Sequence, residues 1–166
     1  MMPAVIQVCV HDLCLVYHIY HADVECQDFK NFLKDGLVKF VTVDFMNDRK
    51  VLGRIGLVVG NPFDLQKKWL LPSGGQPSML TLAGAMVHPS YGKLEKPKYT
   101  IHRYAWQRNV LDIDHIRYAA MDGYLCFNIY KGWMKSNSQV CGSSKEVSAK
   151  RKRDKDEVED VDEDSE

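Results

Sequence analysis

Short runs of apolar residues, broken by polar turns, dominate the first sixty residues of the chain. Val5–Val10 and Leu13–Tyr17 are rich in Val, Ile and Leu, and only His11 and Asp12 separate them. This pattern predicts two strands joined as a hairpin by a tight turn. Leu37–Val43 alternates with β-branched residues and predicts a third strand.

Two helices are expected between and after these strands. Asp23 is a suitable N-cap for a helix that carries apolar residues on one face and ends at Gly36. Asn47 or Asp48 would begin a second, shorter helix that Gly56 closes. The first third of the chain therefore mixes strands with helices.

The middle of the chain is less regular. Leu57–Val59 predicts a brief strand, and Phe63–Leu71 has the composition of a helix. Ser78 predicts the N-cap of a helix that runs to about Val87.

The last helix has the clearest pattern. It would start at Asp112 or Asp114 and run to about Met134. Its predicted inward residues are Ile116, Ala119, Ala120, Leu125 and Ile129. Strands followed by alternating strands and helices indicate the α/β class.

Charge divides the chain into two parts. Residues 136–166 carry six basic and ten acidic residues, no aromatic residue and only isolated valines. Such a segment buries too little apolar surface to offset chain entropy. We therefore expect a folded domain over residues 3–134 and a disordered, charged tail over residues 135–166. Residues 1–135 have 16 basic and 12 acidic residues, a mild excess that suits a polyanionic partner.

Composition narrows the class of protein further. Hydrophobic residues make up 45% of the chain and aromatic residues 10%, as in a globular protein. No secretory signal is recognised at the start of the sequence, and no apolar run approaches the ~20 residues of a membrane span. Five cysteines without a CxxC pair favour reduced thiols in the cytosol or nucleus.

Three stretches of the chain carry a family resemblance. They are VIQVCVHDLCLVYHIYHAD, FVTVDFMNDRKVLGRIGLVVGNPFDLQ, and KPKYTIHRYAW followed by LDIDHIRYAAMDGYLCFNIY. In this order and spacing they resemble 3′–5′ exonuclease domains of the DEDD type that use a tyrosine. They resemble especially the small plant proteins similar to the Werner-syndrome exonuclease domain. The resemblance implies a ribonuclease-H-like mixed sheet flanked by helices.

The resemblance also implies a site. In this family four carboxylates hold two divalent metals, Mg²⁺ or Mn²⁺, which clamp the attacking water and the leaving oxygen of a phosphodiester. The matching positions here are Asp48 and Asp122 as metal ligands and Tyr118 as the residue that orients the water. Tyr118 and Asp122 are four residues apart and would project from one face of a helix.

The sequence departs from the family at its first motif, a central strand that bears Asp-x-Glu. Met1–Val10 contains no Asp or Glu. We expect the family's first strand to be absent, the metals to be held poorly, and an open sheet edge to remain that could recruit a protein partner. A catalytically silent relative, an incomplete gene sequence of an active enzyme, and restoration of the site by another chain remain as explanations.

Other residues suggest contacts with nucleic acid. Lys96, Lys98 and Arg103 could meet phosphates, and Trp106 could stack on a base, although a solvated connection is the alternative. A zinc site built from Cys14, His18, His21 and Cys26 has no common finger spacing. Cys126 lies within the last helix without a base at a recognisable spacing.

These observations lead to one expected function and one alternative. We expect a nucleic-acid-binding protein of the exonuclease family whose cleavage of 3′ ends is lost or severely reduced. The alternative is a non-catalytic interaction protein that pairs through its open sheet edge with a full-length relative or another partner. Lys150–Arg153 resembles a nuclear-import signal, so the location is nuclear or cytoplasmic, with the nucleus favoured.

Overall fold

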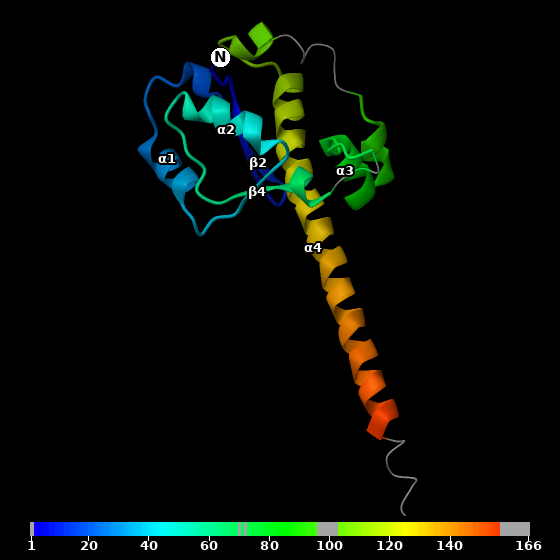
Figure 1. Cartoon of the computed structure of the whole chain (residues 1–166). Helices are drawn as coiled ribbons and strands as arrows, with labels where there is room; N and C mark the ends of the chain where they lie inside the picture. The colour runs from blue at the N-terminus through cyan, green and yellow to red at the C-terminus, as the bar shows by residue number, and fades with distance from the viewer. Residues whose placement is uncertain (1, 70, 72, 96–102, 157–166) are drawn as a thin grey trace, which may run out of the picture. The chain divides into compact units, whose positions relative to one another are not determined.

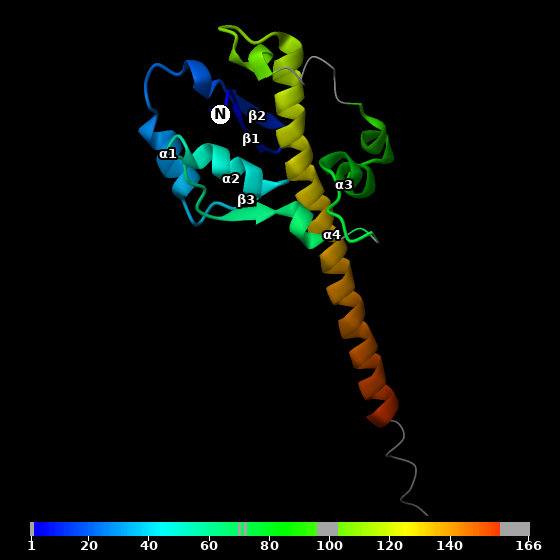
Figure 2. The same cartoon turned by 45° about the horizontal axis from the view of Figure 1, so that its top comes forward.

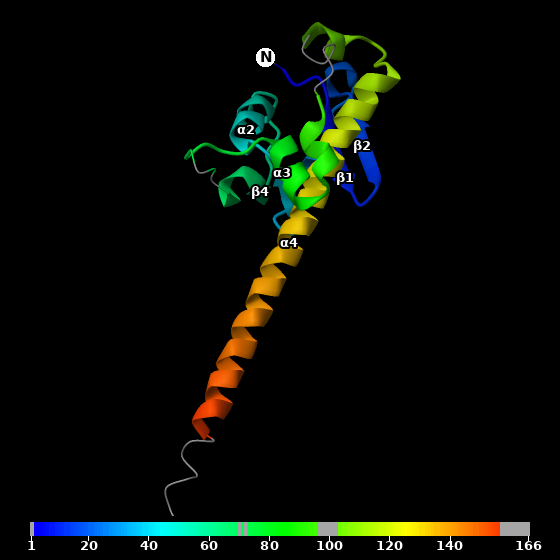
Figure 3. The ribbon, with the colours of Figure 1, turned by 90° about the vertical axis from the view of Figure 1, so that its right-hand side faces the viewer.

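The computed structural model describes residues 2–69, 71, 73–95 and 103–156 (Figure 1). The chain divides into two compact units, Met1–Tyr130 and Lys131–Glu166. All the strands and the helices α1 to α3 belong to the first unit, which Figures 2 and 3 show from two further directions. No helix in the described ranges is long and apolar enough to cross a membrane.

The predicted hairpin is confirmed. Strand β1 (Ile6–Val10) pairs antiparallel with β2 (Leu13–Tyr17), with Cys9 opposite Cys14. The two-residue turn places His11 in the left-handed region at φ 57°. Cys9 and Cys14 are joined as a disulfide, which corrects the expectation of reduced thiols for this pair, whereas Cys26 and Cys126 are free. Cross-strand neighbours lie close enough for such a bond even though their sequence spacing gives no familiar motif.

The first helix is shorter than predicted. Helix α1 spans Gln27–Lys34 and follows Cys26, so Asp23 is not its N-cap. A short 3₁₀ turn, η1 (Ile19–His21), precedes it. The end of α1 lies against Gly60, whose N–H donates to the Leu33 carbonyl at 2.8 Å. A Cβ at Gly60 would collide with the backbone of Lys34, so glycine is required by this close approach.

A β–α–β unit follows. Strand β3 (Phe40–Thr42), helix α2 (Phe45–Gly53) and strand β4 (Pro62–Asp64) form it, with β3 and β4 paired in parallel. The prediction of a strand over Leu57–Val59 was wrong, because the pairing partner of β3 lies a few residues later. The Leu57 side chain is instead buried, at 4% exposure.

Short helical turns connect the rest of the first unit. Residues Leu65–Lys68 form only the 3₁₀ turn η2 where a longer helix was predicted. Helix α3 (Met79–Met86) is confirmed with its cap, since Ser78 Oγ accepts from Thr81 N at 3.1 Å. The 3₁₀ turns η3 (Pro89–Lys93) and η5 (Arg103–Gln107) complete the described connections.

The final helix, α4, spans Ile113–Asp156. Its predicted start is confirmed, because Asp112 Oδ1 accepts from His115 N at 2.9 Å as an N-cap. The helix continues beyond Met134, whereas the sequence predicts a helix end there and disorder over residues 135–166. Lys, Arg, Glu and Ala have favourable helix propensities, and a charge-rich segment can propagate a helix that has already been nucleated. The division into a domain over 3–134 and a tail stays a prediction, and residues 157–166 lie outside the described residues.

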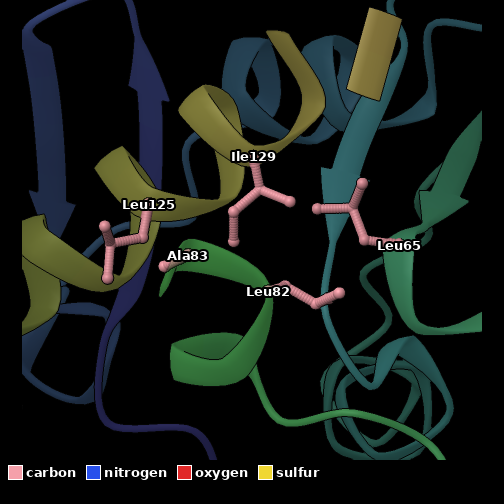
Figure 4. Packing of buried hydrophobic residues seen from close by; sticks show 5 residues of the cluster. All are labelled: Leu65, Leu82, Ala83, Leu125 and Ile129. Carbon is pink, nitrogen blue, oxygen red and sulfur yellow. The ribbon is translucent and has the colours of Figure 1, made fainter. Parts of the chain in front are cut away.

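One cluster of buried side chains forms the core between α3, η2 and α4. Figure 4 shows its members, and their exposure is 3% or less: Leu65, Leu82, Ala83, Leu125 and Ile129. Ala119 was also predicted to face inward and is 2% exposed. Ile116 was predicted inward and is 38% exposed, so the buried stripe of α4 excludes it.

The architecture is α/β, as predicted. One mixed sheet was expected, but the described residues form two separate two-stranded sheets, β1–β2 and β3–β4. Each strand therefore has a partner on one side only within the described part of the chain. This separation decides the shape of the candidate site.

Candidate functional site

Asp48 lies in the first turn of α2. The residue before this helix is Asp44, whose left-handed backbone (φ 64°, ψ 47°) turns the chain sharply out of β3. Its carboxylate accepts a hydrogen bond from the Asn47 side chain. Asp44, rather than Asn47 or Asp48, thus occupies the N-cap position, and Asp48 has no capping role.

A third carboxylate, Asp64, reaches the same end of the unit. It is the last residue of β4, and its Oδ2 accepts from the Phe45 N–H of α2 at 3.3 Å. Its Oδ1 accepts from Gln66 N at 3.1 Å. Parallel pairing of β3 with β4 brings Asp64 beside the start of α2, where a helix N-terminus favours negative charge.

Asp48 is perturbed by these surroundings. Burial among protein atoms, with added repulsion from Asp44 and Asp64, raises the pKa of Asp48 from 3.8 to about 6. Its side chain still reaches solvent, which fits a position at the mouth of a cavity. No cation among the described residues contributes to lowering the pKa of Asp48.

Tyr118 and Asp122 lie on α4, as predicted from their spacing. Partial burial and the nearby Asp122 carboxylate raise the pKa of Tyr118. The Tyr118 ring is 6.2 Å from that of Trp106, and the Trp106 ring stacks edge-on against His115 at 4.8 Å. Both Tyr118 and Asp122 line a cavity of about 360 Å³ together with α3 residues.

A larger cavity brings Asp48 and Asp122 together. Its volume is about 610 Å³, and residues of β1, β3, α2 and α4 border it. Cys126 also lines it, and burial together with the Asp122, Asp48 and Asp64 carboxylates raises the pKa of this thiol to about 12. A thiol with so high a pKa is neutral at physiological pH.

The described residues do not fit a pair of metal ions. Three carboxylates act on the same thiol, yet no group of three or more His, Cys, Asp or Glu residues in the described part of the chain is arranged to hold a metal ion. Mg²⁺ requires near-octahedral oxygen ligands. Asp48 and Asp122 share a cavity without forming such a set.

The residues predicted to contact nucleic acid are only partly described. Lys96 and Lys98 lie outside the described residues. Arg103 begins η5, and Trp106 lies within it. Trp106 is half-buried, its carbonyl is 3.0 Å from His18 Nε2, and its ring packs on His115. Packing therefore engages the Trp106 ring, and only its exposed part could meet a base.

Three of the four candidate zinc ligands have other partners, and Cys26 is a free, exposed cysteine. Cys14 is bonded to Cys9, and His21 Nε2 lies 2.8 Å from the Gln107 carbonyl. His18 Nε2 contacts the Trp106 carbonyl, so the two histidines connect the η1 region to η5. No metal-holding group occurs among them within the described ranges.

Sequence reasoning missed Asp44 and Asp64 as neighbours of Asp48. Asp64 belongs to the Asp-Leu pair of the second resembling stretch, but only the non-local pairing of β3 with β4 brings it close. Asp44 lies four residues before Asp48, and its left-handed backbone has no sequence signal beyond the residue type, since Asp adopts this conformation more readily than most.

Comparison with known proteins assigns the family. The family model described as 3′–5′ exonuclease matches residues 3–136, and the chain belongs to this family. The ribonuclease-H-like fold class agrees with this membership and with the mixed α/β order of elements. Among curated proteins, none matches the chain.

Solved structures similar to the chain include crystal structures of the EXD2 exonuclease domain. One was soaked in Mn and Mg; it is 21% identical, with a TM-score of 0.35, covering 87% of this chain and 76% of that one. A second, soaked in Mn and dGMP, has the same identity and TM-score and covers 85% and 74%. A third is 22% identical with a TM-score of 0.34, covering 86% and 75%.

Proposed function

We propose that this 166-residue polypeptide binds nucleic acid weakly and cleaves 3′ ends slowly or not at all. The observation that carries the proposal is the ligand set. Asp48 and Asp122 line one cavity, but the described residues include no group of three ligands that could hold a metal ion. Family members act through divalent metals, which stabilise the charge that develops during phosphodiester cleavage.

The number of acidic ligands supports the same proposal. Loss of even one strong electrostatic stabiliser can slow an enzyme by ~10²–10³. Here the first-motif pair, Asp-x-Glu, is not found in Met1–Val10.

A cleavage assay tests the loss of activity. The purified chain is incubated with 5′-labelled DNA and RNA oligonucleotides in Mg²⁺ and in Mn²⁺, and shortened products are resolved on a gel. We expect no metal-dependent release of nucleotides above that of the Asp122→Ala variant. Asp28→Asn is the control, because Asp28 lies at an exposed position of α1 and lines neither cavity. Robust cleavage that Asp122→Ala abolishes and Asp28→Asn retains would overturn the proposal.

A binding assay tests contact with nucleic acid. We propose Lys96, Lys98, Arg103 and Trp106 as the contacting residues, because they join basic and aromatic side chains in one segment. Fluorescence anisotropy should show affinity for single-stranded oligonucleotide that falls with salt. Lys96→Ala and Lys98→Ala should each reduce the slope of log K against log[salt] by about one. An affinity that does not depend on salt would refute electrostatic contact.

The separated sheets favour a second candidate function. β1 and β3 each have one partner strand within the described residues, and an unpaired edge is a template for another strand. We infer that the chain could act as a non-catalytic interaction protein that pairs with a full-length relative or another partner. Co-purification with such a relative after nuclease treatment would support this role. Complete loss of the complex after nuclease treatment would point back to nucleic acid.

We also propose nuclear location, on the basis of the basic cluster Lys150–Arg153. A fluorescent fusion of the whole chain should accumulate in nuclei, and replacement of the four basic residues by alanine should redistribute it. Equal distribution of both fusions would reject the proposal.

A further inference from the structure

The cavity of about 610 Å³ borders two sheet edges at once. It is lined by the consecutive residues Ile6–Val10 of β1 and by Phe40–Thr42 of β3. Neighbouring residues of a strand point to opposite faces, so a cavity over one face would touch only every second residue. Contact with consecutive residues means that the edge of each strand borders the cavity. We call this cavity the strand slot.

The pairing of both strands leaves peptide groups directed toward the strand slot. Phe40 N–H donates to the Asn61 carbonyl at 2.9 Å, so the peptide groups of Phe40 face β4. Peptide groups alternate in direction along a strand, and those of Val41 therefore face the opposite edge. On β1, the two-residue turn makes Val10 and Leu13 a hydrogen-bonded pair, so the peptide groups of Cys9 are directed away from β2.

The residues that line the strand slot indicate the chemistry of an occupant. Most of its walls are apolar, with side chains such as Val8, Val41 and Val51 from three elements. Thr42 also lines it, and its buried Oγ1 has no hydrogen-bond partner in the described structure. A buried hydroxyl without a partner favours an occupant with a polar group nearby.

Charge is unevenly distributed around the strand slot. Asp44, Asp48 and Asp122 line it, and Lys39 is the only cationic residue among the described lining residues. Lys39 Nζ lies 3.1 Å from the Tyr130 hydroxyl and over the Phe63 ring, so it already has partners. An occupant with a cationic side chain near Asp48 would offset the excess negative charge, whereas a carboxylate would add to it.

We propose that the strand slot binds one extended peptide segment of another chain, which pairs with β1 and β3 together and places a Lys or Arg beside Asp48. Its remaining side chains are apolar or small and polar at alternate positions. This inference deepens the second candidate function and rests on it, because it names the site and the chemistry of the partner. β-strand addition of this kind derives affinity from main-chain hydrogen bonds and specificity from the alternate side chains.

The test uses synthetic nine-residue peptides of alternating valine and threonine, measured by fluorescence anisotropy against the full chain in EDTA. Two carry a single lysine, one at each end, so that either strand direction can present it to Asp48. We expect one of the two to bind saturably and to raise Tm with peptide concentration. The same peptide with glutamate in place of lysine should bind at least tenfold more weakly. Equal or tighter binding of the glutamate peptide would overturn the proposed chemistry.

N-methylation of the peptide tests simultaneous pairing with both strands. A central strand uses the N–H groups of its odd and its even residues, so methylation of either set should weaken binding by at least tenfold. A strand that adds to one edge alone loses affinity with only one set. Sensitivity to a single set would therefore reject the strand slot while leaving edge pairing intact.

Protein variants locate the binding. Val51→Trp should fill the strand slot and reduce affinity at least tenfold, whereas Val110→Trp, at an 80% exposed position, should not. Asp48→Asn should reduce the advantage of lysine over glutamine in the peptide. Thermal unfolding and circular dichroism confirm that each variant folds. If both tryptophan variants bind alike, the site lies elsewhere; if a full-length relative still co-purifies, the second candidate function survives without the strand slot.

Discussion

The two sides of the last helix contrast within the first unit. Leu125 and Ile129 pack into the closed core with α3 and η2, at 1% and 0% exposure. Asp122 and Cys126, one turn away, line the strand slot between two sheets that do not meet. One side is satisfied by contacts within the chain, and the other presents unpaired strand edges and clustered carboxylates. The same helix thus supports both stability and the candidate site.

The largest expected effect lies on the closed side. Leu125→Ala removes a side chain that is 1% exposed and leaves a cavity among Leu65, Leu82 and Ile129. Such truncations cost about 2–5 kcal/mol of unfolding free energy. Urea unfolding of the variant measures it, and Met121→Ala, at a 40% exposed position of the same helix, is the control. Two variants within about 0.5 kcal/mol of each other would contradict the assignment of this core.

A smaller effect is expected where α4 meets the hairpin. A Cβ added at Gly123 would lie 2.7 Å from Cys9 Sγ, so Gly123→Ala should destabilise the protein by about 1–3 kcal/mol despite its better helix propensity. Replacing Cys9 by alanine removes the obstacle and also opens the disulfide to Cys14, an effect that is common to both Cys9→Ala arms of a double-mutant cycle. In a double-mutant cycle, Gly123→Ala should therefore destabilise the Cys9→Ala variant by less than it destabilises the wild type.

Gly53→Ala is the matched glycine control for that cycle. Nothing lies within 4 Å of an added Cβ there, and the residue is the last of α2. Its effect should stay within about 1 kcal/mol of wild type. Additive effects of Cys9→Ala and Gly123→Ala would show that the hairpin does not contact α4 at this point.

The smallest effect concerns Asp48 and pH. Its pKa is about 6 in the folded chain against 3.8 otherwise, so the native state holds the proton more tightly. The contribution of Asp48 to the unfolding free energy should therefore decrease as the pH rises from about 4 to about 7. Asp48→Asn removes that dependence, and the variant should gain on wild type across this window by less than about 1 kcal/mol, since the side chain reaches solvent.

Unfolding in urea between pH 4 and 8 measures this difference, because urea is uncharged and does not screen the repulsion from Asp44 and Asp64. Asp28→Asn, at an exposed position of α1, is the control and should show no such trend. A variant that becomes less stable than wild type as the pH rises would show that a cation compensates Asp48 in solution.

Local patterns in the sequence predicted much of the fold. The hairpin, the Ser78 cap and the start of α4 each depend on residues within a few positions of one another, and the structure confirms them. The parallel β3–β4 pair was missed because it joins segments about twenty residues apart across α2, and three-residue strands carry little periodicity. The α/β class survived these local errors.

The candidate site was also predicted only in part, chiefly where its residues are close in sequence or share one helix. Tyr118 and Asp122 share a helix, so their spacing predicted a common face, and Asp48 and Asp122 do line one cavity. Asp44 and Asp64 were missed because a left-handed residue and a non-local strand place them near Asp48. Metal ligation by Asp48 and Asp122 stays a prediction.

The hairpin of β1 and β2 has a consequence for how the chain folds. All its pairings join residues at most eleven positions apart, so closing it requires a very short loop. Hairpins of this kind form in about 1–10 μs, well before parallel strands separated by a helix can meet. We expect amide protons of β1 to gain protection ahead of those of β3 during refolding. The hairpin would then be formed while β3 and β4 are still unpaired.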